Sequence, residues 1–227
     1  MRKARTLARQ LAERYSYRDP QRYWNARHAR HRSGLEGVGC ISIGQQANEA
    51  DYDTKWRHLH ASLSKAPGGS RLLDAGCGNG FFMERAARIG FDVEGVDFSP
   101  VAVDLARQRL GNAVPISVGP LDRFRPARSY DVVMCIDVLF HVVDDDIWRA
   151  TVTNLARMAG RELLIQDHLV DAAAICAGHT STVVHCRWRT LEMYCEALPD
   201  WELVDHDVYE LPCERETKDL LKFVPKR

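Results

Sequence analysis

The chain has 227 residues, which is enough for one α/β domain and an additional segment. Its 31 basic and 31 acidic residues cancel overall, but residues 1–32 carry ten Lys or Arg against two acids, so the remainder is acidic. No apolar run is long enough to span a membrane, and the basic beginning of the chain lacks the apolar core of a signal peptide. We therefore do not expect a membrane protein.

The seven cysteines are scattered along the chain and form no Cys-x-x-Cys pair. An odd number of dispersed cysteines suits a reducing compartment and argues against a structural zinc site. The sequence therefore predicts a cytoplasmic location.

Residues 1–66 are predicted to form a helical segment ahead of the main domain. Over residues 4–17 the apolar side chains share one helical face, and arginines cover the other. Glycines between residues 34 and 44 mark a loop, and residues 46–64 are again helical. The basic face could bind nucleic-acid phosphates, face solvent or form a homodimer contact. We do not expect nucleic acid as a partner, because the rest of the chain is acidic.

Residues 72–80, Leu-Leu-Asp-Ala-Gly-Cys-Gly-Asn-Gly, are the most informative stretch. Two apolar residues lead to Asp74, and glycines at alternate positions then open a helical stretch over residues 81–89. This pattern predicts a buried strand, a tight turn and a helix start. Glycine lets the backbone approach a ligand closely, and the turn presents N–H groups at the positive end of a helix. The spacing differs from the Gly-x-Gly-x-x-Gly fingerprint of dinucleotide-binding proteins.

A second strand is predicted to end at Asp97, 23 residues after Asp74. An acid about 20 residues beyond a glycine turn is placed to bind ribose, because a carboxylate accepts hydrogen bonds from both hydroxyls. A solvated acid at a strand end is the alternative for Asp97. Ser99 is a good N-cap and Pro100 suits the first helical position, so a helix is predicted over residues 100–110.

The rest of the chain continues to alternate strands and helices. Strands are predicted at residues 114–118, 130–136, 162–166, 201–208 and 219–224, and helices at 145–158 and 190–198. Such alternation is typical of α/β proteins with a parallel sheet.

The Asp-x-Gly-x-Gly-x-Gly pattern resembles motif I of the Rossmann-like methyltransferases that use S-adenosylmethionine. The Asp-Phe-Ser-Pro stretch after the second strand, and the Tyr-Asp-Val-Val and Val-Leu-Phe-His stretches of the fourth, are similar to the same family. The resemblance covers residues 67–227. It implies an α/β fold: a Rossmann-like seven-stranded, mostly parallel sheet with helices on both faces and a reversed seventh strand. Residues 1–66 would then be an N-terminal helical lid.

The resemblance also implies how the cofactor is held. The glycine turn would pack against the methionine part of S-adenosylmethionine. Asp74 would organise the turn and face the ammonium group, directly or through water. Pro120 stands where the family often has the acid that bonds the adenine amino group. Either Asp122 substitutes for that acid, or backbone groups read the adenine.

Residues 23–28 resemble a Tyr-Trp-x-x-Arg-His stretch that approaches the cofactor in some relatives. Packing inside the lid is the alternative for Tyr23 and Trp24. The expected cofactor-binding residues are Asp74, Gly76, Cys77, Gly78, Asn79, Gly80, Asp97, Phe98, Ser99, Pro120, Leu121, Asp122, Cys135, Tyr23, Trp24 and Arg27.

Three histidines are candidates for the catalytic base. Removing a proton from a hydroxyl or ammonium acceptor needs a base, and His suits neutral pH. Ligands of open α/β sheets bind beyond the carboxyl ends of the strands. That rule selects His168, beside Asp167, as the preferred base, then His141 and His185. A backbone hydrogen bond within the strand-to-helix turn is the alternative for His141.

The connection over residues 169–189 carries further polar side chains. Arg187 and Arg189 could clamp a substrate carboxylate or phosphate, or cap the helix that follows. His179, His185 and Cys186 are zinc-ligand types, but their spacing matches no familiar zinc module, so no metal is predicted.

Together these features predict a biosynthetic methyltransferase that moves the methyl group of S-adenosylmethionine to an oxygen or nitrogen of a small molecule. One alternative is an RNA or protein methyltransferase that uses the basic N-terminal arm. Another is a non-catalytic S-adenosylmethionine-binding protein. The fourth strand ends in Cys-Ile-Asp-Val rather than an Asn-Pro-Pro-Tyr type of motif, which favours a small-molecule acceptor.

Overall fold

The computed structural model describes residues 19–32, 34–63, 66–178 and 185–227. The helix predicted at residues 4–17 and the candidate ligand His179 lie outside the described residues. None of the helices within those ranges is both long and apolar enough to cross a membrane. All seven cysteines fall within the described ranges and all are free thiols.

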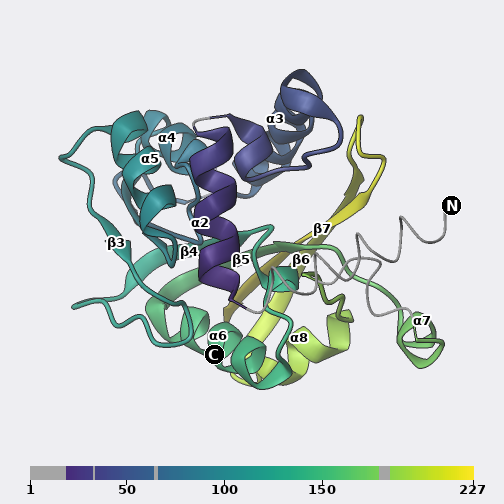
Figure 1. Cartoon of the computed structure of the whole chain (residues 1–227). Helices are drawn as coiled ribbons and strands as arrows, with labels where there is room; N and C mark the ends of the chain where they lie inside the picture. Colours follow the sequence, from purple (N-terminus) through teal and green to yellow (C-terminus); the bar gives the residue numbers. More distant parts are fainter. Residues whose placement is uncertain (1–18, 33, 64–65, 179–184) are drawn as a thin grey trace, which may run out of the picture.

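A single seven-stranded sheet forms the centre of the molecule (Figure 1). Its strands are β1 (Arg71–Ala75), β2 (Asp92–Asp97), β3 (Ile116–Val118), β4 (Tyr130–Ile136), β5 (Ala159–Asp167), β6 (Trp201–Glu210) and β7 (Thr217–Pro225). The order is β3-β2-β1-β4-β5-β7-β6. Strands β1 to β5 run parallel, and β7 is antiparallel to both β5 and β6. The predicted fold class, including the reversed seventh strand, is confirmed.

Helices cover both faces of the sheet because the strands are apolar on both. Leu72 and Val132 contribute to one core cluster, and their neighbours Leu73 and Val133 contribute to the other. Side chains of α3 (Gly44–Leu63), α4 (Phe81–Arg88) and α5 (Pro100–Leu110) join the first cluster. Side chains of α6 (Asp145–Met158) and α8 (Leu191–Ala197) join the second.

The predicted start of α5 is confirmed in detail. The Ser99 hydroxyl accepts a hydrogen bond from the Ala102 N–H, and Pro100 occupies the first turn. Elsewhere the bounds differ from the predictions. β5 begins at residue 159 rather than 162, because it follows α6 without a loop, and β3 has only three residues.

Several short elements were not predicted. They are α2 (Pro20–His31), α7 (Ala172–Cys176) and the 3-10 turns at Leu35–Gly37 and Leu139–His141. The start of α2 carries an ordinary signal, since the Asp19 carboxylate caps the Arg22 N–H and Pro20 follows it. α2 crosses in front of the sheet (Figure 1). It is tied to the end of β2 by Gln21, whose Nε2 donates to the Phe98 carbonyl at 2.6 Å.

Candidate active site

The glycine turn after β1 has a backbone that only glycine adopts readily. Gly76, Gly78 and Gly80 have φ angles of 85°, 53° and 79°. The Gly76 and Cys77 N–H groups both donate to the Val96 carbonyl, which ties the turn to β2. A Cβ at Gly76 would overlap with the Val138 side chain. The turn therefore excludes side chains at this position on both conformational and steric grounds.

Asp97 joins the turn to the start of α5. One carboxylate oxygen accepts from the Gly78 N–H at 2.9 Å, and the other accepts from the Ser99 N–H at 2.8 Å. Burial raises the pKa of Asp97 to about 6, and the backbone N–H bonds oppose that rise. Each carboxylate oxygen has a second lone pair, so both can still accept from a ligand.

Asp74 is a second buried carboxyl, at the end of β1. Its Oδ2 atom has no hydrogen-bond partner among the described residues. Burial and the nearby Asp97 charge raise the pKa of Asp74 to about 8. Because no described cation lies beside these two buried carboxyl groups, this part of the site is favourable for a positively charged ligand.

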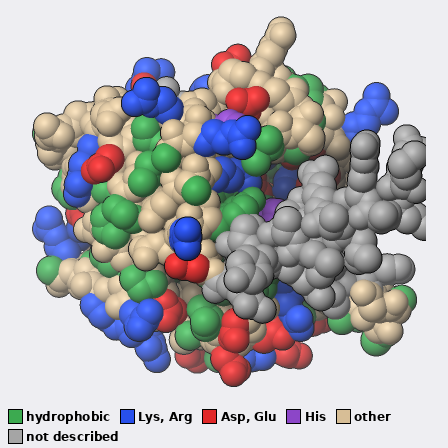
Figure 2. Space-filling view, viewed as in Figure 1, with side chains coloured by type: hydrophobic (Ala, Val, Ile, Leu, Met, Phe, Trp, Pro, Cys, Tyr) green, Lys and Arg blue, Asp and Glu red, His purple; other side chains and the backbone are tan. Residues whose placement is uncertain are grey.

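A cavity of about 640 Å³ opens beside the glycine turn. On one side it is lined by the turn, the end of β2 and residues 120–123; on the other it is lined by α2, α3 and the segment after β4. Apolar side chains gather on the face that α2 and its neighbouring helices present (Figure 2). Lining residues that were predicted to bind cofactor are Gly76, Cys77, Gly78, Asn79, Asp97, Phe98, Pro120, Leu121, Asp122 and Trp24.

Helix α2 brings aromatic rings to the cavity wall. Trp24 is buried and meets the His141 ring edge-on, with 4.8 Å between ring centroids. Tyr23 packs on His185 instead, at 5.4 Å. The Arg27 guanidinium lies 4.9 Å from the centre of the Trp24 ring and donates to the carbonyls of Glu36 and Gly39. α2 thus contributes Trp24 to the cavity, and Arg27 holds the loop that follows the helix.

A charged cluster closes the cavity at the carboxyl end of β4. Asp137 lines the cavity with a left-handed backbone, φ 57°. Its carboxylate lies 2.6 Å from the Lys55 ammonium of α3 and 3.5 Å from the Lys218 ammonium of β7. Burial alone would raise the pKa of Asp137, but the Lys218 and Lys55 charges outweigh it and hold that pKa well below its usual range.

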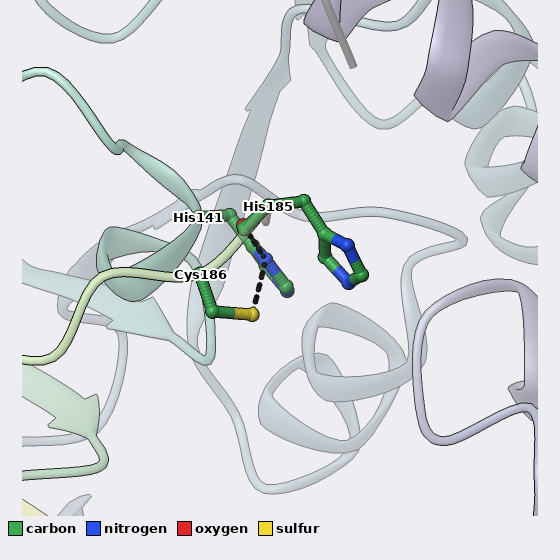
Figure 3. A group of neighbouring side chains, drawn as sticks. All are labelled: His141, His185 and Cys186. Carbon is green, nitrogen blue, oxygen red and sulfur yellow. Dashed lines mark hydrogen bonds between the residues drawn. The ribbon is translucent and has the colours of Figure 1, made fainter. Parts of the chain in front are cut away.

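His141 also lines the cavity. Its Nδ1 lies 3.0 Å from the His185 carbonyl oxygen and 3.5 Å from the Cys186 sulfur (Figure 3). Burial lowers the pKa of His141 to about 3, so the ring is neutral at pH 7. The ring also packs beside that of His185, with 5.5 Å between centroids.

Comparison with known proteins matches this site to one family. Residues 72–161, which run from β1 into β5, match the family described as a methyltransferase domain. The ubiquinone biosynthesis O-methyltransferase of Sinorhizobium medicae is 36% identical over 125 residues, which cover 53% of this chain and 50% of that protein. The enzyme of the same name from Xanthomonas axonopodis is 33% identical over 138 residues, 54% of this chain and 57% of that protein.

Solved structures agree on the fold. Magnesium protoporphyrin IX methyltransferase from Synechocystis, with bound S-adenosylmethionine, has a TM-score of 0.71 at 20% identity and covers 91% of this chain and 95% of its own. The N-methyltransferase NodS from Bradyrhizobium japonicum has a TM-score of 0.64 at 20% identity, over 78% of this chain and 88% of its own. Residues 72–161 therefore belong to this methyltransferase family, and the fold is that of the class I S-adenosylmethionine-dependent methyltransferases. The predicted family is confirmed for this part of the chain. The chain spans about half the length of the curated relatives it matches.

The residues of the site fit S-adenosylmethionine. Asp97 reaches the cavity with lone pairs for ribose hydroxyls. The unpartnered Oδ2 of Asp74 would suit the ammonium group of the cofactor through a bridging water, since Asp74 lies behind the lining residues. Pro120 and Asp122 both line the cavity, so the two readings of the adenine contact stay open. Asp74, Gly80, Ser99, Cys135, Tyr23 and Arg27 are described residues that do not line the cavity.

The structure separates the three candidate bases. His141 lines the cavity, whereas neither His168 nor His185 is among the described lining residues. The His168 Nδ1 lies 2.9 Å from the Thr217 carbonyl, and its ring lies 5.0 Å from that of Trp188. This placement does not support the preference for His168. Its neighbour Asp167 is buried and accepts from the Tyr194 hydroxyl.

The two arginines of the same connection bind the protein itself. Arg187 and Arg189 both pair with Asp145 in the first turn of α6, at 2.7 and 3.0 Å. Arg189 is fully buried, donates to the Val142 carbonyl and packs over Trp148. The suggested clamp for a substrate anion is therefore wrong for Arg189, whose charge is already neutralised inside the fold.

Proposed function

We propose that this protein transfers the methyl group of S-adenosylmethionine to an oxygen or nitrogen of a small molecule. The observation that carries this proposal is that the glycine turn, Asp97, Trp24 and His141 line the same cavity. Its volume of about 640 Å³ falls in the range of small-molecule sites, roughly 300–1,000 Å³. The similar proteins are named for ubiquinone biosynthesis and for magnesium protoporphyrin IX, which are small molecules. These names also support a small acceptor.

The reaction divides the site into two halves. When bound, S-adenosylmethionine supplies an activated methyl group on a sulfonium. Asp97 would accept hydrogen bonds from the ribose, and Asp74 would face the ammonium group. The acceptor would lie against Trp24 and His141, on the other side of the cavity. Orienting the acceptor against the methyl group can supply much of the rate enhancement, about 7–11 kcal/mol in well-oriented systems.

Neutral His141 is suited to orient an acceptor hydroxyl, since an imidazole nitrogen with a lone pair accepts a hydrogen bond. Helix α2 would exclude water from the methyl group, as lids do in other enzymes. The proposal also keeps the predicted domain organisation, in which residues 1–66 form the lid and residues 67–227 form the S-adenosylmethionine-binding domain. The expectations of a cytoplasmic location and of no nucleic-acid partner stay predictions.

The direct test supplies purified protein with S-adenosylmethionine carrying a labelled methyl group. Three acceptor pools are offered separately: a small-molecule metabolite extract, total RNA and denatured protein. We expect label in the small-molecule pool only, with no transfer by Gly76→Val. Label in RNA or protein would replace the proposed acceptor class, and cofactor binding without transfer to any pool would favour a non-catalytic protein.

A further inference from the structure

Three side chains of metal-ligand type meet at the edge of the cavity. His141 comes from the turn after β4, and His185 and Cys186 come from the connection before α8. One ligand atom from each lies within 4.8 Å of the ligand atoms of the other two. The Cys186 sulfur points toward the His141 ring, and the His185 ring lies on the far side of it (Figure 3).

The backbone on either side of Cys186 is fixed to the turn that carries His141. The His185 carbonyl accepts from the His141 Nδ1, and the Arg187 N–H donates to the Phe140 carbonyl at 2.7 Å. A carbonyl can only accept, so the first of these bonds places the proton on Nδ1 and leaves the lone pair on Nε2. Metal-ligating histidines commonly hold their other nitrogen in this way.

We propose that His141, His185 and Cys186 bind one Zn²⁺ ion. Nitrogen and sulfur ligands select zinc over Mg²⁺ or Ca²⁺, which prefer oxygen. Ligand atoms on a tetrahedral zinc with ordinary bond lengths lie about 3.3–3.8 Å apart, so closing the observed spacing takes small side-chain rotations. The sequence-based prediction of no metal rested on His179, His185 and Cys186, which are close in sequence. His141 is far from them in sequence, and only the fold brings it beside His185 and Cys186.

The position of the cluster suggests what the ion would do. Because His141 lines the cavity, three protein ligands would leave a fourth position open toward the acceptor, as in catalytic zinc sites. Resting on the proposed function, we infer that the ion holds an acceptor hydroxyl or thiol at this position, in place of the direct hydrogen bond from the acceptor to His141. Zinc would favour loss of the acceptor proton to water. The acceptor atom would then bond to the methyl carbon as the carbon–sulfur bond of the sulfonium breaks.

The test measures metal directly in untagged full-length protein, after loading with zinc and removal of excess ion. We expect about one zinc per chain in the wild type and more than about a tenfold loss in Cys186→Ser and in His185→Ala. Matched controls are Cys195→Ser and His60→Ala, which change exposed residues of α8 and α3 and should keep the ion. Cobalt(II) provides a second probe, with a thiolate-to-cobalt absorption band that Cys186→Ser removes.

S-adenosylmethionine affinity, measured by calorimetry in every variant, separates this inference from the proposed function. Cofactor binding at wild-type strength in Cys186→Ser and His185→Ala would show that they fold. Zinc that is absent from the wild type, or retained by both ligand variants, would overturn the metal site even if methyl transfer is found. Zinc bound without methyl transfer to any acceptor would overturn the proposed function and leave the metal site in place.

Discussion

The two halves of the cavity are built in different ways. The cofactor half consists of residues 74–99, whose backbone N–H groups and two carboxyl groups would do the binding, together with residues 120–123. The acceptor half brings together α2, α3 and the turn after β4. One half therefore depends on backbone geometry and the other on side chains from distant segments, so acceptor specificity can change without disturbing the cofactor.

The halves also differ in how their buried charges are balanced. Asp74 and Asp97 have raised pKa values because burial is not offset by a cation from the described part of the chain. Asp137 has a lowered pKa because Lys55 and Lys218 neutralise it within the protein. The cofactor half thus gains when a cationic ligand enters, whereas the charges of the acceptor half are already satisfied.

The largest expected effect is in the glycine turn. Gly76→Val places a branched side chain at φ 85° against Val138, and we expect cofactor binding to become undetectable by calorimetry. Gly111→Val is the matched control, because Gly111 also has φ 85° but nothing within 4 Å of its Cβ position. Equal loss in both variants would mean that backbone strain alone, rather than the turn beside the cofactor, explains the result.

The second comparison is between two histidines. His141→Ala should lower turnover by roughly a hundredfold, because the acceptor loses the side chain that orients it, with cofactor affinity unchanged. His168→Ala should have a small effect, because His168 lies outside the cavity lining. Steady-state turnover with the identified acceptor checks both. A larger loss in His168→Ala would restore the sequence-based preference for His168.

The third prediction tests the ribose-binding carboxylate. Asp97→Ala removes a charged partner of two buried N–H groups and should weaken cofactor binding by roughly 1.5–3 kcal/mol, about a ten- to hundredfold effect. Asp92→Ala changes an exposed acid at the start of the same strand and should leave affinity unchanged. Calorimetry showing equal affinity for wild type and Asp97→Ala would remove Asp97 from the site.

The fourth prediction follows from the pKa of Asp97, raised by burial to about 6. A raised carboxyl pKa favours the protonated form in the folded apoprotein, so its contribution to stability is present at low pH and is lost as pH rises through 6. Cofactor affinity has the opposite trend, because the ionised carboxylate is the better acceptor. We expect roughly tenfold tighter binding at pH 7 than at pH 5. Asp97→Asn should flatten this pH dependence, whereas Asp92→Asn should keep it.

The sequence could predict the cofactor half because its function follows from neighbouring residues. The glycine spacing determines the turn, and the strand period places Asp97 at the carboxyl end of β2. The same argument could have found α2, since Asp19 and Pro20 form an ordinary helix start.

The acceptor half could not be predicted in the same way. Lys55, Asp137 and Lys218 lie on α3, beyond β4 and on β7, and no sequence spacing relates them. Their contact depends on strand order and helix packing. The rule that ligands lie beyond the carboxyl ends of strands selected both His141 and His168, but it could not tell which ring faces the cavity.

The smallest expected effect tests whether α2 is coupled to the cofactor half. Gln21→Ala removes the hydrogen bond to the Phe98 carbonyl, worth about 0.5–1.5 kcal/mol, so cofactor affinity and turnover should each fall by about two- to tenfold. Arg30→Ala, at an exposed position of the same helix, is the control and should change neither. If α2 is a lid, the loss in turnover should exceed the loss in affinity, because the freed helix admits water to the reacting groups. Equal effects of Gln21→Ala and Arg30→Ala would show that α2 only packs against the domain and does not influence cofactor binding.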